Sequence, residues 1–183
     1  MTREKLLDPT GSDRKTGGSD LAQRPASLRG LTVGLLGNTK PNAEVLLAEI
    51  ADELKGRYDV GEFRSYTKDY FGTPVKTELF DQIVAECDVV VTAVGDCGSC
   101  SAATVADGIA FERAGIPAVA IISDSFLLSG NAMARMQGFG GFEFIAVHHP
   151  VASLGEAELH GRVQAVLPDV LRILGAEPAG VRA

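Results

Sequence analysis

The amino-acid sequence predicts an α/β fold: a doubly wound, five-stranded and mainly parallel sheet in a flavodoxin-like three-layer sandwich. Two observations lead to this prediction. Five apolar runs alternate along the chain with stretches of helical periodicity, and each run is continuous instead of alternating between apolar and polar residues. Continuous apolar strands are typical of parallel sheets that helices cover on both faces. Five such strands favour an open doubly wound sheet over a closed barrel.

The first half of the chain contains three of the predicted strands. Residues 31–36 indicate a buried strand, and Pro41 suits the first turn of the next helix, where its missing N–H would have had no partner. Apolar residues then recur at helical spacing as far as Leu54. The elements expected next are a strand over residues 58–63, a helix over residues 77–86 and a β-branched strand over residues 88–94.

The second half of the chain continues the alternation. Gly115 is a stop signal for the helix before it, while Ser123 and Asp124 are residue types that cap a helix N-terminus. Pro168 lies inside the last helical pattern and is expected to kink or split that helix. The elements expected here are helices over residues 101–114, 123–137 and 156–174, and strands over residues 116–122 and 142–147.

Length, composition and charge limit the organisation and the partners. The 183 residues fit one domain, which we expect over residues 30–178. Residues 1–29 are polar and rich in turn formers, which predicts a disordered or loosely attached N-terminal arm. A net charge of −7 argues against binding to nucleic acid or to an anionic membrane. Because there is neither a long apolar span nor a signal-peptide core, we expect a cytoplasmic protein.

Polar candidate residues follow the first, third and fifth predicted strands. In a sheet of order 2-1-3-4-5, ligands bind beyond the carboxyl ends of the strands, where strands one and three lie side by side. We expect a small-molecule substrate there, and the candidate substrate-binding residues are Asn38, Lys40, Asn42, Ser99, Ser101 and His148. Two alternatives stay open: Asn38 only shapes its turn, and Lys40 is only solvated. The first loop lacks the glycine pattern of a nucleotide site, so no cofactor is expected.

The strongest local signal is a Cys-x-x-Cys motif where a strand ends and a helix begins. In a reducing compartment, such a pair is more often redox-active, catalytic or metal-binding than a structural disulfide. Because a helix N-terminus stabilises a thiolate, Cys97 is the candidate nucleophile, and Cys100 is the candidate resolving thiol. Asp96 is a catalytic candidate that would position a proton, although its charge also opposes a thiolate. His149 is the candidate acid or base.

Structural interpretations of the same residue types also apply. The cysteine pair could be inert, and Cys87, at a helix end, is expected to be a buried structural residue. A structural zinc ion usually needs four ligands, and His148 and His149 are the obvious additional candidates, so no metal is expected. His160 lies in a predicted helix and is expected to be a solvated surface residue.

Four blocks of sequence, in this order, carry a resemblance to a known family. They are Gly34–Ala43, Val94–Cys100, Glu112–Pro117 and His148–Pro150. Together they resemble the UGSC family, which is named for selenocysteine-Gly-Ser-Cys and is similar to the selenoprotein B subunits of glycine, sarcosine and betaine reductases. The resemblance covers residues 31–175. It places the selenocysteine position on Cys97 and the partner thiol on Cys100, with sulfur here as a weaker nucleophile and poorer leaving group than selenium.

The resemblance implies reductive bond cleavage, and the leading hypothesis is a thiol-dependent oxidoreductase. Cys97 attacks a small electrophilic substrate, Cys100 resolves the adduct, and a thioredoxin-like partner reduces the resulting disulfide. The alternatives are non-redox thiol addition followed by elimination or hydrolysis, and a zinc-binding or scaffold subunit of a larger complex. A racemase-like enzyme is disfavoured because it needs cysteines from two separate loops. A second subunit that completes the site and a homo-oligomer both stay open.

Overall fold

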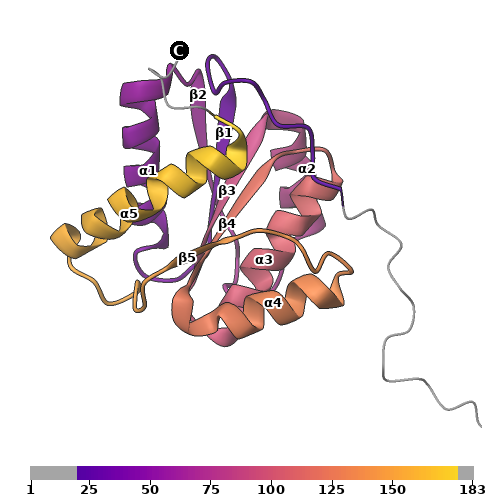
Figure 1. The fold of residues 1–183 in the computed structure, drawn as a ribbon, viewed down its shortest axis with the longest axis vertical. Helices are drawn as coiled ribbons and strands as arrows, with labels where there is room; N and C mark the ends of the chain where they lie inside the picture. Colours follow the sequence, from indigo (N-terminus) through magenta and orange to yellow (C-terminus); the bar gives the residue numbers. More distant parts are fainter. Residues whose placement is uncertain (1–19, 177–183) are drawn as a thin grey trace, which may run out of the picture.

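The structure, a computed structural model, describes residues 20–176. Five parallel strands form one sheet in the order β2-β1-β3-β4-β5, which confirms the predicted doubly wound, flavodoxin-like fold (Figure 1). The strands are β1 Thr32–Gly37, β2 Glu62–Thr67, β3 Val89–Gly95, β4 Ala118–Ser123 and β5 Ile145–Val147. The chain order reverses beside β1, so the expected ligand-binding edge is the one where β1 and β3 end.

Helices cover both faces of the sheet. They are α1 Ala43–Tyr58, α2 Thr77–Glu86, α3 Gly98–Arg113, α4 Leu127–Met136 and α5 Glu156–Leu174. Figure 1 shows α1 and α5 on one face and α2, α3 and α4 on the other. Every residue of β3 and of β4 is buried between these layers, which explains why both strands are continuous apolar runs in the sequence.

Two predicted strands have different bounds in the structure. The prediction of a strand over residues 58–63 is wrong for residues 58–61, because β2 begins only at Glu62. Helix α1 continues to Tyr58, and the left-handed backbone of its C-cap residue Asp59 stops the helix. The predicted strand over residues 142–147 is shortened to β5. The ring of Phe142 packs edge-on against that of Phe139, with 5.6 Å between ring centroids, and belongs to the core beneath α3 and α4.

The helix signals were partly misleading. The helix predicted from residue 101 begins at Gly98, because Cys97 caps it. Ser123 does not cap α4: its hydroxyl donates to Gly95 and Asp96, and a short 3₁₀ turn over Asp124–Phe126 comes first. Helix α5 runs through Pro168 without a split, since its buried apolar face packs on the sheet along the whole length of the helix.

The N-terminal segment is attached more firmly than the sequence predicted. Residues 1–19 lie outside the described residues, as do residues 177–183, but residues 20–29 pack on the domain. Leu28 is only 1% exposed, and Arg24 makes a 2.8 Å ion pair with the buried carboxylate of Glu112 on α3. The backbone N–H of Ala22 donates to the same carboxylate at 2.7 Å. The expected loose arm therefore does not extend to residue 29.

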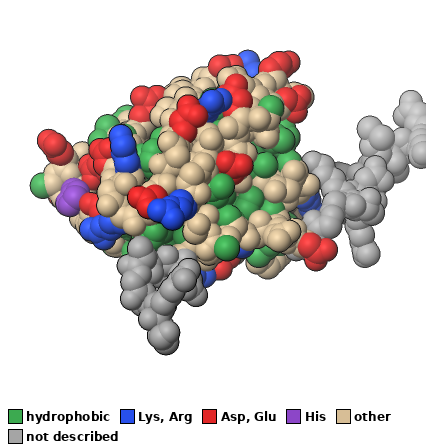
Figure 2. Space-filling model, turned by 90° about the horizontal axis from the view of Figure 1, so that it is seen from above, with side chains coloured by type: hydrophobic (Ala, Val, Ile, Leu, Met, Phe, Trp, Pro, Cys, Tyr) green, Lys and Arg blue, Asp and Glu red, His purple; other side chains and the backbone are tan. Residues whose placement is uncertain are grey.

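The surface carries charges of both signs. Figure 2, which views the molecule from above Figure 1, shows acidic and basic side chains interspersed with apolar ones on that face. The whole chain has 24 acidic and 17 basic residues. Among the described residues, no helix is long and apolar enough to cross a membrane.

Candidate active site

The turn between β3 and α3 is the centre of the candidate site. Gly95 ends β3 and must be a glycine, because a Cβ there would lie 2.6 Å from the backbone of Ser101 in the first turn of α3. The hydroxyl of Ser101 donates to the Gly95 carbonyl at 2.9 Å and is fully buried. Ser101, a predicted substrate-binding residue, therefore joins the helix to the strand. The close approach brings the start of α3 directly onto the sheet edge.

Cys97 and Cys100 occupy that first turn and are joined by a disulfide, with the sulfur atoms 2.04 Å apart. Cys97 is the N-cap residue, and its sulfur accepts a hydrogen bond from the Cys100 backbone N–H at 3.2 Å. Cys97 is partly exposed, whereas Cys100 is fully buried. The exposed hydroxyl of Ser99 lies 3.6 Å from the Cys97 sulfur. In the reduced protein, the same N–H donor and the helix dipole would stabilise a thiolate on Cys97.

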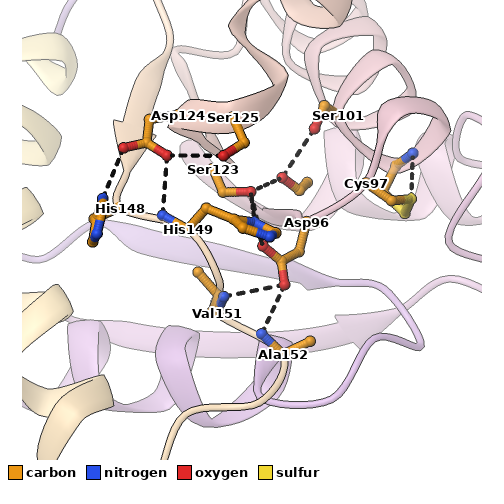
Figure 3. Close-up of polar contacts among 12 residues, drawn as sticks. Asp96, Cys97, Ser101, Ser123, Asp124, Ser125, His148, His149, Val151 and Ala152 are labelled. Atoms are coloured by element: carbon orange, nitrogen blue, oxygen red, sulfur yellow. Dashed lines mark hydrogen bonds and ion pairs between the residues drawn. A yellow bond between two sulfur atoms is a disulfide. The ribbon is translucent and has the colours of Figure 1, made fainter.

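Asp96 connects the cysteine turn to the loop that follows β5. One carboxylate oxygen, Oδ1, accepts hydrogen bonds from the Ser123 hydroxyl at 2.8 Å and from His149 Nδ1 at 3.0 Å. The other, Oδ2, accepts from the backbone N–H groups of Val151 at 3.1 Å and Ala152 at 2.8 Å. Figure 3 shows these donors converging on the carboxylate. Asp96 is thus buried with four hydrogen-bond donors around it.

This arrangement keeps Asp96 ionised. Burial by itself raises the pKa of Asp96, but the hydrogen bonds from Ala152, Ser123 and Val151, together with the charge of His149, lower it below its usual value. An ionised carboxylate accepts, so His149 Nδ1 carries the hydrogen. Among the described residues, His149 Nε2 has no hydrogen-bond partner, and the side chain is 35% exposed. The imidazole is therefore held through one nitrogen while the other is available.

The two neighbouring histidines have different surroundings. His148 is exposed, and its Nδ1 lies 2.9 Å from Oδ2 of Asp124. The backbone N–H of His149 donates to the other oxygen of Asp124 at 3.1 Å. Hydrogen bonds from both histidines lower the pKa of Asp124. In Figure 3, His148 lies away from Asp96, so only His149 joins the network beside the cysteine turn.

The loop after β1 provides structural contacts as well as one surface cation. Asn38 is buried, its amide donates to the Val94 carbonyl at 2.9 Å, and its oxygen accepts from the Lys40 backbone N–H at 3.0 Å. Asn42 donates to the carbonyls of Val151 and Leu154 at 2.9 and 3.0 Å. These contacts fit the alternative in which Asn38 shapes its turn. The Lys40 ammonium lies 4.4 Å from the centre of the Phe71 ring.

Sequence reasoning missed three contributors to this edge. The residue types of Ser123 and Asp124 predict helix caps, although both residues come directly after the fourth predicted strand, at the same edge of the sheet as the other candidate loops. The segment from Lys68 to Val75, which follows β2, was overlooked because the predicted strand ended four residues too early. Within residues 20–176, no three His, Cys, Asp or Glu side chains gather into a group that could hold a metal ion.

Comparison with known proteins gives one positive result. The model of the UGSC family matches residues 5–176 of this chain. A search of the curated proteins finds no match. The match confirms the family resemblance that the four sequence blocks indicated, whereas the similarity to selenoprotein B subunits stays a prediction.

Proposed function

Because the chain belongs to the UGSC family, we propose that it is a cysteine-dependent enzyme that cleaves a bond in a small electrophilic substrate by reduction. One observation carries this proposal. Cys97 and Cys100 are within disulfide distance in the first turn of α3, directly after the Asp96 that holds His149. A thiol pair that can close into a disulfide can deliver two electrons, and the adjacent imidazole can deliver a proton.

Cys97 is the proposed nucleophile. Its sulfur is the more accessible of the pair, and it already accepts a backbone hydrogen bond at the helix N-terminus. A thiol in this position commonly has a lowered pKa, so a larger fraction is thiolate at neutral pH. Cys100 is buried in the same turn, where a substrate cannot reach it but the Cys97 sulfur can.

His149 is the proposed proton donor, with Asp96 as the residue that positions it. The Asp96 carboxylate fixes Nδ1 and stabilises the positive charge when the ring is protonated. Figure 3 shows His149 on one side of Asp96 and Cys97 on the other. In the proposal, the substrate binds between His149 and Cys97, with the leaving group beside Nε2 of His149.

In the proposed reaction, the substrate R–X has an electrophilic carbon in R and a leaving group X. The Cys97 thiolate forms a C–S bond as the C–X bond breaks, and X leaves with a proton from His149. The Cys100 thiolate then attacks the Cys97 sulfur, the S–S bond forms as the C–S bond breaks, and the electron pair departs on carbon, which takes up a proton. The products are R–H, HX and the disulfide. Carbon leaves in this way only beside a group such as a carbonyl that stabilises the carbanion.

A dithiol protein of the thioredoxin class would restore the thiols. It would attack the partly exposed Cys97 sulfur, form a mixed disulfide and leave both cysteines reduced. This requirement separates the redox proposal from the alternative of non-redox addition and elimination or hydrolysis, which consumes no reductant.

The decisive experiment is intact-mass analysis of the reduced protein after exposure to small carbonyl compounds with amino, thio or halo groups on the α carbon. After reaction with a substrate, we expect the mass of the wild-type protein to fall by two hydrogens, because the disulfide forms. The Cys100→Ser variant should instead gain the mass of a covalent adduct on Cys97. Cys87→Ser should behave as the wild type. An adduct that turns over equally well in Cys100→Ser, with no disulfide formed, would support the non-redox alternative. Metal analysis of the purified protein tests the zinc-binding subunit.

A further inference from the structure

A buried ion pair lies behind the cysteine turn. Lys68, directly after β2, and Asp107, in the middle of α3, place Nζ and Oδ2 2.6 Å apart, with side-chain exposures of 3% and 0%. Removing two charges from water costs free energy, and the attraction between the charges often does no more than offset that cost. A packed pair of apolar side chains often stabilises a fold equally well. The pair therefore calls for a reason beyond stability, and the reason lies in what else the two side chains hold.

Both side chains also make hydrogen bonds to the far end of the segment from Lys68 to Val75. The Lys68 ammonium also donates to the Thr73 carbonyl at 2.9 Å, and Asp107 Oδ1 accepts from the Val75 backbone N–H at 2.7 Å. The backbone N–H of Lys68 donates to the carbonyl of Gly37 at the end of β1, at 3.0 Å. Three points of the segment are thus fixed to the same ion pair and to the sheet edge.

The middle of this segment reaches the candidate active site. A Cβ on Gly72 would lie 3.4 Å from the hydroxyl oxygen of Ser99, which stands between the two cysteines. The neighbouring Phe71 ring lies under the Lys40 ammonium of the first loop. Tyr70 is 52% exposed, and its ring centre is 4.3 Å from that of Phe71. Residues 70–72 therefore form a wall between Lys40 and the cysteine turn.

We propose that Lys68 and Asp107 are positioning residues, which hold this wall against Ser99 and so limit the size of the molecule that reaches the Cys97 sulfur. The proposal rests on the proposed function only in taking Cys97 as the reacting thiol. Neither side chain touches substrate. Their effect passes through residues 70–72, because an anchored loop keeps its packing on Ser99 while an unanchored one opens.

The test compares two alkylating reagents on the reduced protein: iodoacetamide, which is small, and a dye-linked maleimide, which is bulky. Rates at Cys97 are read by peptide mass and normalised to the same reagents acting on the unfolded protein. The double variant Lys68→Met with Asp107→Asn removes both charges and leaves neither partner as an isolated ion. We expect its bulky-to-small rate ratio to rise severalfold, because an unanchored segment admits the larger reagent more readily. Phe71→Ala, which thins the wall itself, should shift the ratio in the same direction.

A matched control lies at the other end of the same helix. Arg24→Met breaks the ion pair with Glu112 and should lower the melting temperature without changing the ratio. If the double variant does not fold, Phe71→Ala, which leaves the ion pair intact, still tests whether residues 70–72 limit access to Cys97, and an unchanged ratio in that variant would overturn the proposal. An unchanged ratio in a folded Lys68 or Asp107 variant would overturn the proposal. Turnover does not enter this measurement, so a failure of the proposed function, seen as full turnover by Cys97→Ser, is recognised separately.

Discussion

The carboxylate of Asp96 and the imidazole of His149 are 53 positions apart in the chain, yet they are joined by a 3.0 Å contact between Oδ1 and Nδ1. Asp96 begins the turn after β3 and His149 follows β5, with β4 between these strands in the sheet. Ser123, at the end of β4, bridges the gap because its hydroxyl donates to the same Asp96 oxygen. Three strand ends thus meet at one carboxylate, beside the cysteine pair.

The stability of the protein should depend on the charge of Asp96. Because the folded-state pKa of Asp96 is lowered, its contribution is fully present above the ordinary aspartate pKa of about 4 and is lost as the pH falls through the folded-state value. Asp96→Asn should lower the free energy of unfolding at neutral pH by about 1–3 kcal/mol, since buried donors lose their acceptor. Urea unfolding between neutral pH and pH 3 measures both effects. An equally steep acid slope in the variant would contradict the assignment.

Replacement of His149 should stop turnover and leave the fold intact. His149→Ala removes the proposed proton donor, and general acid catalysis contributes about 100-fold or more. His160→Ala is the matched control, because that imidazole is exposed on α5 and contacts Glu49. The assay is turnover of the substrate that the mass experiment identifies. If His149→Ala keeps full activity while Cys97→Ser is inactive, the imidazole is structural and the proton comes from water.

Cys97 should be the most reactive of the three thiols. Limited alkylation of the reduced protein at neutral pH is expected to label Cys97 first, because Cys100 is fully buried and Cys87 is only 6% exposed. Burial also raises the pKa of Cys87, which leaves less thiolate. Peptide mass spectrometry identifies the labelled residue. Labelling of Cys87 ahead of Cys97 would remove the basis of the proposed mechanism.

Two truncations should differ in their effect on the melting temperature. Deletion of residues 1–25 removes Arg24 and Ala22 from the buried Glu112 carboxylate and should lower the melting temperature by several degrees, because an unpaired buried charge is costly. Deletion of residues 1–19 keeps both contacts and serves as the control. Equal melting temperatures for the two truncated proteins would show that these contacts contribute little to stability.

The sequence alone determined the fold class and indicated the centre of the candidate site. Continuous apolar runs that alternate with helices are typical of strands buried on both faces of a parallel sheet. The positions of β3 and β4 in the chain, each between two helices, therefore follow from the apolar pattern. The rule that loops at the carboxyl ends of parallel strands share one edge then brought together Asp96, Cys97 and His149. Local information was sufficient because each of these residues directly follows, or nearly follows, a strand.

Tertiary structure alone decided what each polar side chain at that edge does. Asn38, Ser101 and Ser123 have the chemistry of substrate-binding residues, but backbone carbonyls and Asp96 occupy their polar groups. Asp96 acquired its role from donors on β4 and on the loop after β5, and Lys68 from a helix that begins thirty residues later in the chain. Hydrogen bonds act over about 3 Å in space and are independent of sequence separation, so a pattern of neighbouring residues carries no record of these partners.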